Sequence, residues 1–198
     1  DGSGFSGFGG FGGHGSAGFD QKGQDLNASV SVTFDEAAFG CDKRITLQDQ
    51  SGKAQTLEVH IPAGIDSGKS IRLRGKGMPG TGKGGAGDLL LKVTVQPKAG
   101  YERKGMDVYT TVSIPYTTAV FGGEARVHTL YGDVMCKIKE GTQSGSKIRL
   151  RGKGIVSMKD ANVHGDQYVT VQIQVPRHLN AEARQKLMEY KKAAAGGR

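Results

Sequence analysis

The sequence predicts a mostly β fold made of two tandem small β-sandwich-like domains that come from an internal repeat, followed by a short C-terminal helix. Two observations predict it. Apolar and polar residues alternate over several short stretches between glycine-rich turns, which is typical of half-buried strands. One block of about 75 residues occurs twice, and a core of that size is marginal alone, so we expect two stacked copies. No helical pattern of 10–15 residues separates the strands, which favours mostly antiparallel sheets.

The N-terminal residues 1–23 are predicted to be a flexible linker. Ten of the 33 glycines and four of the seven phenylalanines fall within residues 1–24. This composition has neither helical nor strand periodicity, and a glycine-rich chain loses much backbone entropy when it is ordered. We therefore expect a mobile tether that carries aromatic side chains.

Two β-domains are predicted, the first over residues 24–103 and the second over residues 104–178. The segment IPAGIDSGKSIRLRGKG (61–77) matches IKEGTQSGSKIRLRGKG (138–154) at 11 of 17 positions. Upstream, VSVTFDEAAFG (30–40) parallels VSIPYTTAVFG (112–122), and downstream GDLLLKVTV (87–95) parallels GDQYVTVQI (165–173). Each copy is expected to run as a strand, a short turn ending in Phe-Gly, two strands, a glycine loop and a last strand.

Residues 179–198 predict a C-terminal helix and tail. Asn180 can cap a helix through AEARQKLMEYKKAAA, and Gly196 can end it. The apolar residues Ala183, Leu187 and Tyr190 recur at helical spacing. They must pack either on the second β-domain or on the same helix of a second chain, and the repeated layout favours a symmetric dimer.

Motifs that carry chemistry are weak in this sequence, which argues against an enzyme. Cys41 and Cys136 lack zinc-ligand spacing and are interpreted as reduced thiols, and the five histidines lie far apart, so no metal or cofactor is expected. The glycine motifs near residues 64–84 fail as nucleotide-binding loops on spacing and context. Ser67 and Ser144 lie in Ser-Gly turns, where a hydroxyl bonds the backbone. No signal core or membrane span is present, which favours a cytoplasmic location.

The formal net charge of +8 raises the question of an acidic partner. The basic residues Arg72, Arg74 and Lys76 recur as Arg149, Arg151 and Lys153. They alternate with apolar residues and are expected to face outward. Such a surface is solvated, meets an acidic peptide, or attracts DNA through phosphate charge. DNA binding is the alternative function, although stacking aromatic residues are missing from residues 64–104 apart from Tyr101.

Taken in order, these motifs closely resemble the C-terminal, substrate-binding half of DnaJ-type co-chaperones. The resemblance rests on the Gly/Phe-rich leader, IPAGIDSGKSIRLRGKGMPG, GDLLLKVTV, YERKGMDVYTTVSIPYTTAVFGGEARVHTL, EGTQSGSKIRLRGKG and the terminal helix. No Cys-x-x-Cys zinc repeats are present, so the chain resembles the zinc-less subtype. It also lacks the His-Pro-Asp tripeptide of a J-domain, and we expect a fragment of a longer protein.

The resemblance implies a function in protein folding. A co-chaperone of this kind binds exposed apolar segments of unfolded polypeptides and delivers them to a DnaK-type chaperone, as a homodimer joined by the C-terminal helix, without cofactor or membrane. It implies these peptide-binding residues: Ala28 and Val30 on one strand, Ile45 and Leu47 on its neighbour, Tyr101 as an aromatic wall, and Lys43 to meet the acidic C-terminal tail of the DnaK partner. Alternation alone favours a core for these apolar positions, whereas the resemblance favours a groove that an extended peptide joins as an added strand.

Overall fold

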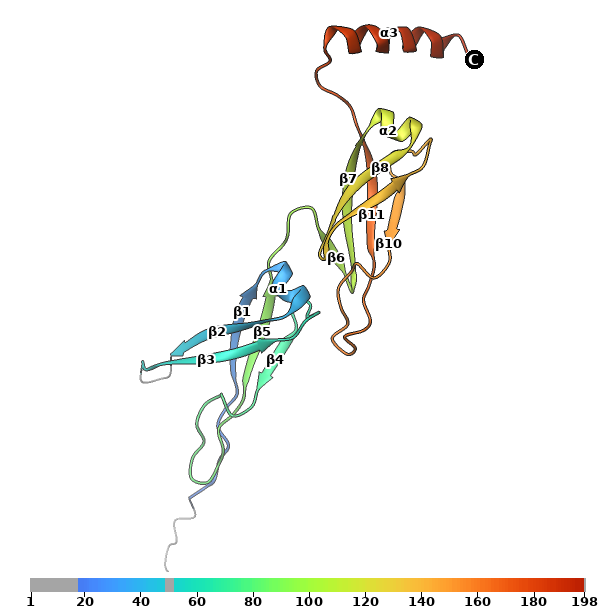
Figure 1. The fold of residues 1–198 in the computed structure, drawn as a ribbon. Coiled ribbons are helices and arrows are strands. Elements are labelled where there is room, and N and C mark those ends of the chain that lie inside the picture. The colour runs from blue at the N-terminus through green and yellow to red at the C-terminus, as the bar shows by residue number, and fades with distance from the viewer. Residues whose placement is uncertain (1–17, 49–51, 198) are drawn as a thin grey trace, which may run out of the picture. The chain divides into compact units, whose positions relative to one another are not determined.

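A computed structural model describes residues 18–48 and 52–197, and in this part the chain consists mainly of strands (Figure 1). The first copy of the repeat comprises β1 (Leu26–Val32), α1 (Phe34–Phe39), β2 (Cys41–Gln48), β3 (Ala54–Ile61), β4 (Ser70–Leu73) and β5 (Leu89–Val95). The second comprises β7 (Asp107–Pro115), α2 (Tyr116–Phe121), β8 (Gly123–Thr129), β9 (Gly132–Ile138), β10 (Lys147–Leu150) and β11 (Gln167–Gln174). Between the copies lies β6 (Glu102–Lys104), and α3 (Ala181–Ala195) follows the second. The mostly β fold, the repeated order of elements and the C-terminal helix are confirmed.

The two copies also pair their strands in the same way. The first copy forms a sheet of order β1-β5-β4 and a hairpin β2-β3, and the second forms a sheet of order β10-β11-β7-β6 and a hairpin β8-β9. Both hairpins and the pairs β4–β5, β10–β11 and β6–β7 are antiparallel, as predicted. The pair β7–β11 is parallel instead. A helix, a hairpin and β10 separate these two strands in sequence, which is enough chain for the crossover that a parallel pair needs.

Short helices occur where the sequence predicts only a turn. At the start of α1, Thr33 Oγ1 accepts the N–H of Glu36 at 3.1 Å, and Glu36 Oε1 accepts the N–H of Thr33 at 3.0 Å. This reciprocal capping box satisfies two N–H groups that the first turn leaves unpaired. In the second copy, α2 follows Pro115 without any side-chain cap. The helix at this place in the repeat therefore forms with or without the capping box.

A carboxylate joins three stretches of chain at one end of each copy. Asp88 accepts hydrogen bonds from Arg72 Nη1 at 2.8 Å and from the N–H of Gly75 at 3.0 Å. The N–H of Asp88 donates to Asp25 at 2.7 Å. The second copy repeats these bonds with Asp166, Arg149, Gly152 and Asp107. The backbone N–H and then the arginine lower the pKa of both central carboxyls, so these groups are charged at neutral pH.

The chain divides into two compact units whose limits differ from those of the repeat. The first unit contains residues 18–30 and 69–93, and the second contains residues 31–68 and 94–197. The predicted domain boundaries at 24–103 and 104–178 follow the repeat and stay a prediction. Residues 1–17 of the predicted linker lie outside the described residues.

In the first unit, the glycine-rich loop before β5 holds the segment that leads into β1. The N–H of Gly23 donates to Gly85 O at 2.9 Å, and the N–H of Met78 donates to Gln24 O at 2.9 Å. The two backbones approach so closely that a Cβ on Gly87 would lie 2.1 Å from Gln24 O. Glycine at this position therefore serves close backbone packing.

Apolar clusters form the core of the second unit. One contains Ile114, Ala119, Ala125, Ile138 and Val171, and another contains Val127, Cys136 and Val169. A further cluster joins Phe34 and Ala38 of α1 to Val108 and Ile155. Beside it, the largely buried guanidinium of Arg103 donates to the carbonyls of Gly64, Ile65 and Gly105 at 2.6 to 2.8 Å. Residues of both copies thus share one packed core in this unit.

The close approach at Gly87 predicts a steep loss of stability on adding one methyl group. Gly87→Ala should lower the free energy of unfolding by about 1–3 kcal/mol, because the new Cβ forces the loop and residue 24 apart. Gly85→Ala is the matched control, since nothing lies within 4 Å of a Cβ there. Urea unfolding of both variants tests this, and equal midpoints would contradict the packing role of Gly87.

Candidate functional site

One face of β2 carries a row of half-buried side chains. Along β2, half-buried and exposed residues alternate strictly, so Lys43, Ile45 and Leu47 lie on the same face. We call these three residues the β2 row. In the register of the hairpin they lie opposite Val59, Leu57 and Gln55 of β3. The row is therefore an apolar strip with a cation at one end.

The second copy shows what the same positions do when they belong to a core. The residues equivalent to the β2 row are Ala125, Val127 and Thr129 of β8, and they are 8%, 3% and 8% exposed. Val127 packs against Cys136 and Val169, with Ile148 and Leu150 beside them. The first copy leaves its row half-buried at the positions that the second copy fills. This difference marks β2 as the candidate site.

The strand that carries the row also has an open edge. Among the described strands, β2 pairs with β3 and with no other. An edge strand presents N–H and C=O groups that an extended peptide can pair with. The site can therefore offer backbone hydrogen bonds that ignore sequence, together with side-chain contacts that favour apolar residues.

The cation of the row is held by an acid from α1. Lys43 Nζ lies 3.0 Å from Glu36 Oε2, and the two side chains are 30% and 28% exposed. The N–H of Thr33 and then the ammonium of Lys43 lower the pKa of Glu36 from its ordinary 4.5 to about 2. Burial, and next the charge of Glu36, raise the pKa of the Cys41 thiol at the start of β2. Glu36 is thus fully charged at neutral pH and faces the same ammonium that a peptide carboxylate would meet.

Comparison with known proteins agrees with this architecture. The family described as "DnaJ C terminal domain" matches residues 26–176. The chain belongs to the DnaJ C-terminal domain family. Two relatives, each named "Chaperone protein DnaJ", come from Lachnospira eligens and Burkholderia pseudomallei, and both are 45% identical to it, over 142 and 145 residues. The matches cover 72% and 73% of this chain but 38% of each relative, so the chain spans well under half the length of these proteins.

The six peptide-binding residues that the DnaJ resemblance implied do not all belong to one described element or unit. Lys43, Ile45 and Leu47 form the β2 row of the second unit. Ala28 and Val30 share a face of β1 and belong to the first unit, where Val30 is 9% exposed. Their role in a groove stays a prediction.

Tyr101, the sixth residue, packs with α1. Its ring centroid lies 5.8 Å from that of Phe34, and Lys98 Nζ lies 5.1 Å from the Tyr101 ring centroid. Burial raises the pKa of the Tyr101 hydroxyl. The ring is therefore partly committed to the core that it shares with Phe34, and its role as a groove wall stays a prediction.

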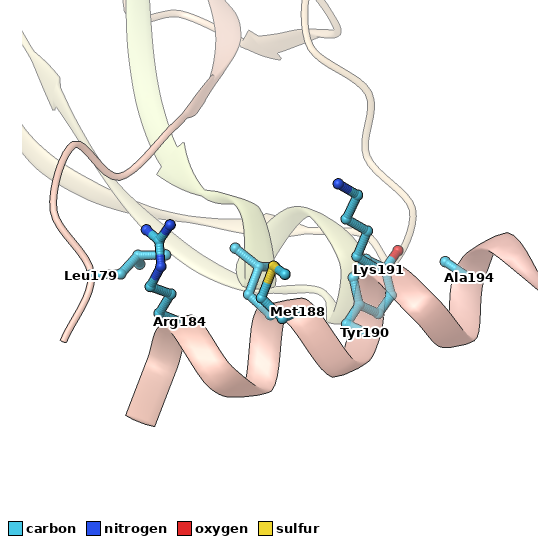
Figure 2. A pocket seen from close by; sticks show the side chains of 7 residues that line it. Leu179, Arg184, Met188, Tyr190, Lys191 and Ala194 are labelled. Atoms are coloured by element: carbon cyan, nitrogen blue, oxygen red, sulfur yellow. The ribbon is translucent and has the colours of Figure 1, made fainter. Parts of the chain in front are cut away.

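The three predicted dimerisation residues lie on α3 as the spacing indicated. The helix begins after Asn180, whose Oδ1 accepts the N–H of Ala183 at 2.7 Å, and it ends at Gly196, as predicted. None of its residues is buried, and Tyr190 reaches α2 through a 2.9 Å hydrogen bond between its hydroxyl and that of Tyr116. Figure 2 shows the smaller of two pockets along this helix, with Met188 between Arg184 and Tyr190. The apolar side of α3 is thus only partly covered within one chain.

A larger pocket of about 870 Å³ lies between α3 and the α2 region of the DnaJ C-terminal domain. Its lining includes Tyr116, Phe121, Val175, Leu187 and Tyr190. Phe121 and Val175 are 76% and 78% exposed. Such a concentration of exposed apolar side chains marks an interaction surface.

Other residues singled out in the sequence serve the fold. Ser67 Oγ accepts the N–H of Val95, and Ser144 Oγ accepts that of Ile173, so both serines bond the backbone as predicted. Arg72 and Arg149, two of the repeated basic residues, are ion-paired with the carboxylates that join the strands, which reduces the charge available to DNA. Within residues 18–48 and 52–197, no three His, Cys, Asp or Glu side chains form a metal-binding group, and no helix is long and apolar enough to span a membrane.

Sequence reasoning missed Glu36, the partner of Lys43. The signal was present as Thr33-x-x-Glu36, a capping-box pattern that predicts a helix start. A helix over 34–39 would have returned the chain toward β2 and brought this acid near the base that lies seven positions later.

The lowered pKa of Glu36 predicts a stability contribution that depends on pH. Because the folded-state pKa lies below the ordinary value, this contribution is fully present above about pH 4.5 and is mostly lost as the pH falls to about 2. The free energy of unfolding of the wild type minus that of Glu36→Gln should therefore fall over this range. Urea unfolding between pH 2 and 7 measures it, and a constant difference would show that Glu36 makes no ionisation-dependent contact.

Proposed function

We propose that this chain is the substrate-binding module of a co-chaperone. It binds exposed apolar segments of unfolded polypeptides, catalyses no reaction, and passes the segments to a DnaK-type chaperone. The observation that carries the proposal is the half-buried β2 row, because the equivalent residues of the second copy are closed into a core. Membership of the DnaJ C-terminal domain family and the name of the relatives support it.

Binding would proceed by strand addition at the open edge of β2. Backbone hydrogen bonds would give affinity for any extended chain, and Ile45 and Leu47 would contact alternate apolar side chains of the client. Lys43 would meet a carboxylate, such as one in the acidic C-terminal tail of the DnaK partner. A site of this kind suits many clients, since only the row itself selects side chains.

The proposal predicts that the apolar part of the row is required for binding. Ile45→Ser combined with Leu47→Ser should weaken an apolar peptide by about tenfold or more, because each truncated contact at a binding centre costs about 1 kcal/mol or more. Fluorescence anisotropy with a labelled extended peptide measures the Kd, and suppression of client aggregation should fall in parallel.

The matched control places two substitutions on the other face of the same strand. Thr46→Ser with Gln48→Ser alters exposed side chains of β2 and should leave the Kd unchanged. Full peptide binding by the Ile45/Leu47 double variant, with an unchanged circular dichroism spectrum, would move the site away from β2.

We also propose that two copies of the chain form a homodimer through α3. The support is the apolar pocket beside α3, whose lining residues Leu187, Tyr190 and Phe121 are 44%, 52% and 76% exposed. A second chain would bury these side chains and stabilise the complex by the hydrophobic effect.

Leu187→Asp should convert the dimer to a monomer, because it places a charge in the buried centre of that interface. Light scattering of the purified chain gives the mass. Gln185→Asp introduces the same residue on α3 at a position that lines neither pocket, and it should keep the dimer mass. A wild type that is already monomeric, or a Leu187→Asp variant with unchanged mass, would reject this interface.

A further inference from the structure

We infer that Glu36 sets the specificity of the β2 row, by holding Lys43 in an internal ion pair that an acidic peptide must compete with. The inference rests on the proposed peptide-binding function of this row. With the pair closed, the row offers a charge-balanced end and an apolar strip, which suits neutral apolar segments. Acidic peptides are bound more weakly than the cation alone would allow.

The geometry places the acid directly on the cation. Glu36 Oε2 lies 3.0 Å from Lys43 Nζ, while Oε1 of the same carboxylate accepts the N–H of Thr33. The capping box thus fixes one oxygen and directs the other toward the ammonium. A peptide carboxylate that approached Lys43 would come close to the charge of Glu36, and like charges at that range repel each other.

The second copy shows that the fold does not need this pair. The positions equivalent to Glu36 and Lys43 are Thr118 and Ala125, and neither carries a charge. Yet α2 and β8 form the same elements in the same order as α1 and β2. The ion pair therefore occurs only in the copy whose row is open, which links it to recognition.

Glu36→Gln isolates the effect of the charge. Glutamine keeps the carbonyl oxygen that accepts the N–H of Thr33, so the capping box is preserved. Asp35→Asn is the matched control, because it removes one charge from the same helical turn but from an acid that pairs with Lys98 at 2.8 Å. Both variants have the same net charge, so a general electrostatic effect would appear in both.

The experiment measures two labelled decapeptides by fluorescence anisotropy at low salt. One carries leucine, valine, two glutamates and a free C-terminus, and the other has glutamines in place of the glutamates and an amidated C-terminus. Glu36→Gln should bind the acidic peptide about 2- to 5-fold more tightly than the wild type, the range expected for a partly exposed ion pair. Asp35→Asn should not show this gain, the neutral peptide should bind all three proteins alike, and Lys43→Gln should weaken only the acidic peptide.

Each outcome separates the inference from the function beneath it. An unchanged affinity of Glu36→Gln for the acidic peptide, or an equal gain in Asp35→Asn, overturns the role of Glu36 while binding of the neutral peptide keeps the proposed function. If the wild type binds neither peptide, both are overturned. Circular dichroism of the Glu36→Gln protein at 25 °C confirms that the variant compared is folded.

Discussion

In each copy of the duplicated unit, three separate stretches of chain meet at the carboxylate of one aspartate. Asp88 binds the arginine of β4 and the N–H of the turn that follows it, and its own backbone bonds both Asp25 and the first residue of β1. Asp166 holds the corresponding stretches of the second copy. Removing the carboxylate would leave a turn N–H and a guanidinium without their charged acceptor. The order of strands in both sheets depends on this group.

Because the sheets are held in this way, the hairpins are the part of each copy that differs. In β8–β9 the inward residues Val127 and Cys136 complete a core. In β2–β3 the strand has the same alternation, but its inward residues stay half-buried and one of them is a lysine. A duplicated scaffold thus supports a closed hairpin in one copy and an exposed one in the other. Stability and recognition need not compete for the same residues.

Local patterns in the sequence predicted the strands, the repeat and the ends of α3, because alternation, repeated motifs and capping residues are local signals. The parallel pairing of β7 with β11 was not predictable, since it depends on the path of the chain between them. Nor could alternation distinguish the half-buried Ile45 from the buried Val127, because both follow the same period and differ only in what covers them. The Glu36–Lys43 contact was missed for a related reason: the intervening residues were expected to form a turn, and α1 brings the two side chains together.

The thiol at the start of β2 makes the chain its own chemical reporter. Cys41 precedes the β2 row by two residues, and its pKa is raised first by burial and then by the neighbouring carboxylate of Glu36. Thiolate is the species that alkylating reagents attack, so the rate of alkylation follows the local charge and solvent access. The second thiol, Cys136, is buried in the core of the other hairpin and reacts more slowly. A peptide lying along β2, or a change in the state of Glu36, therefore registers as a change in the reactivity of one sulfur that the native sequence already provides.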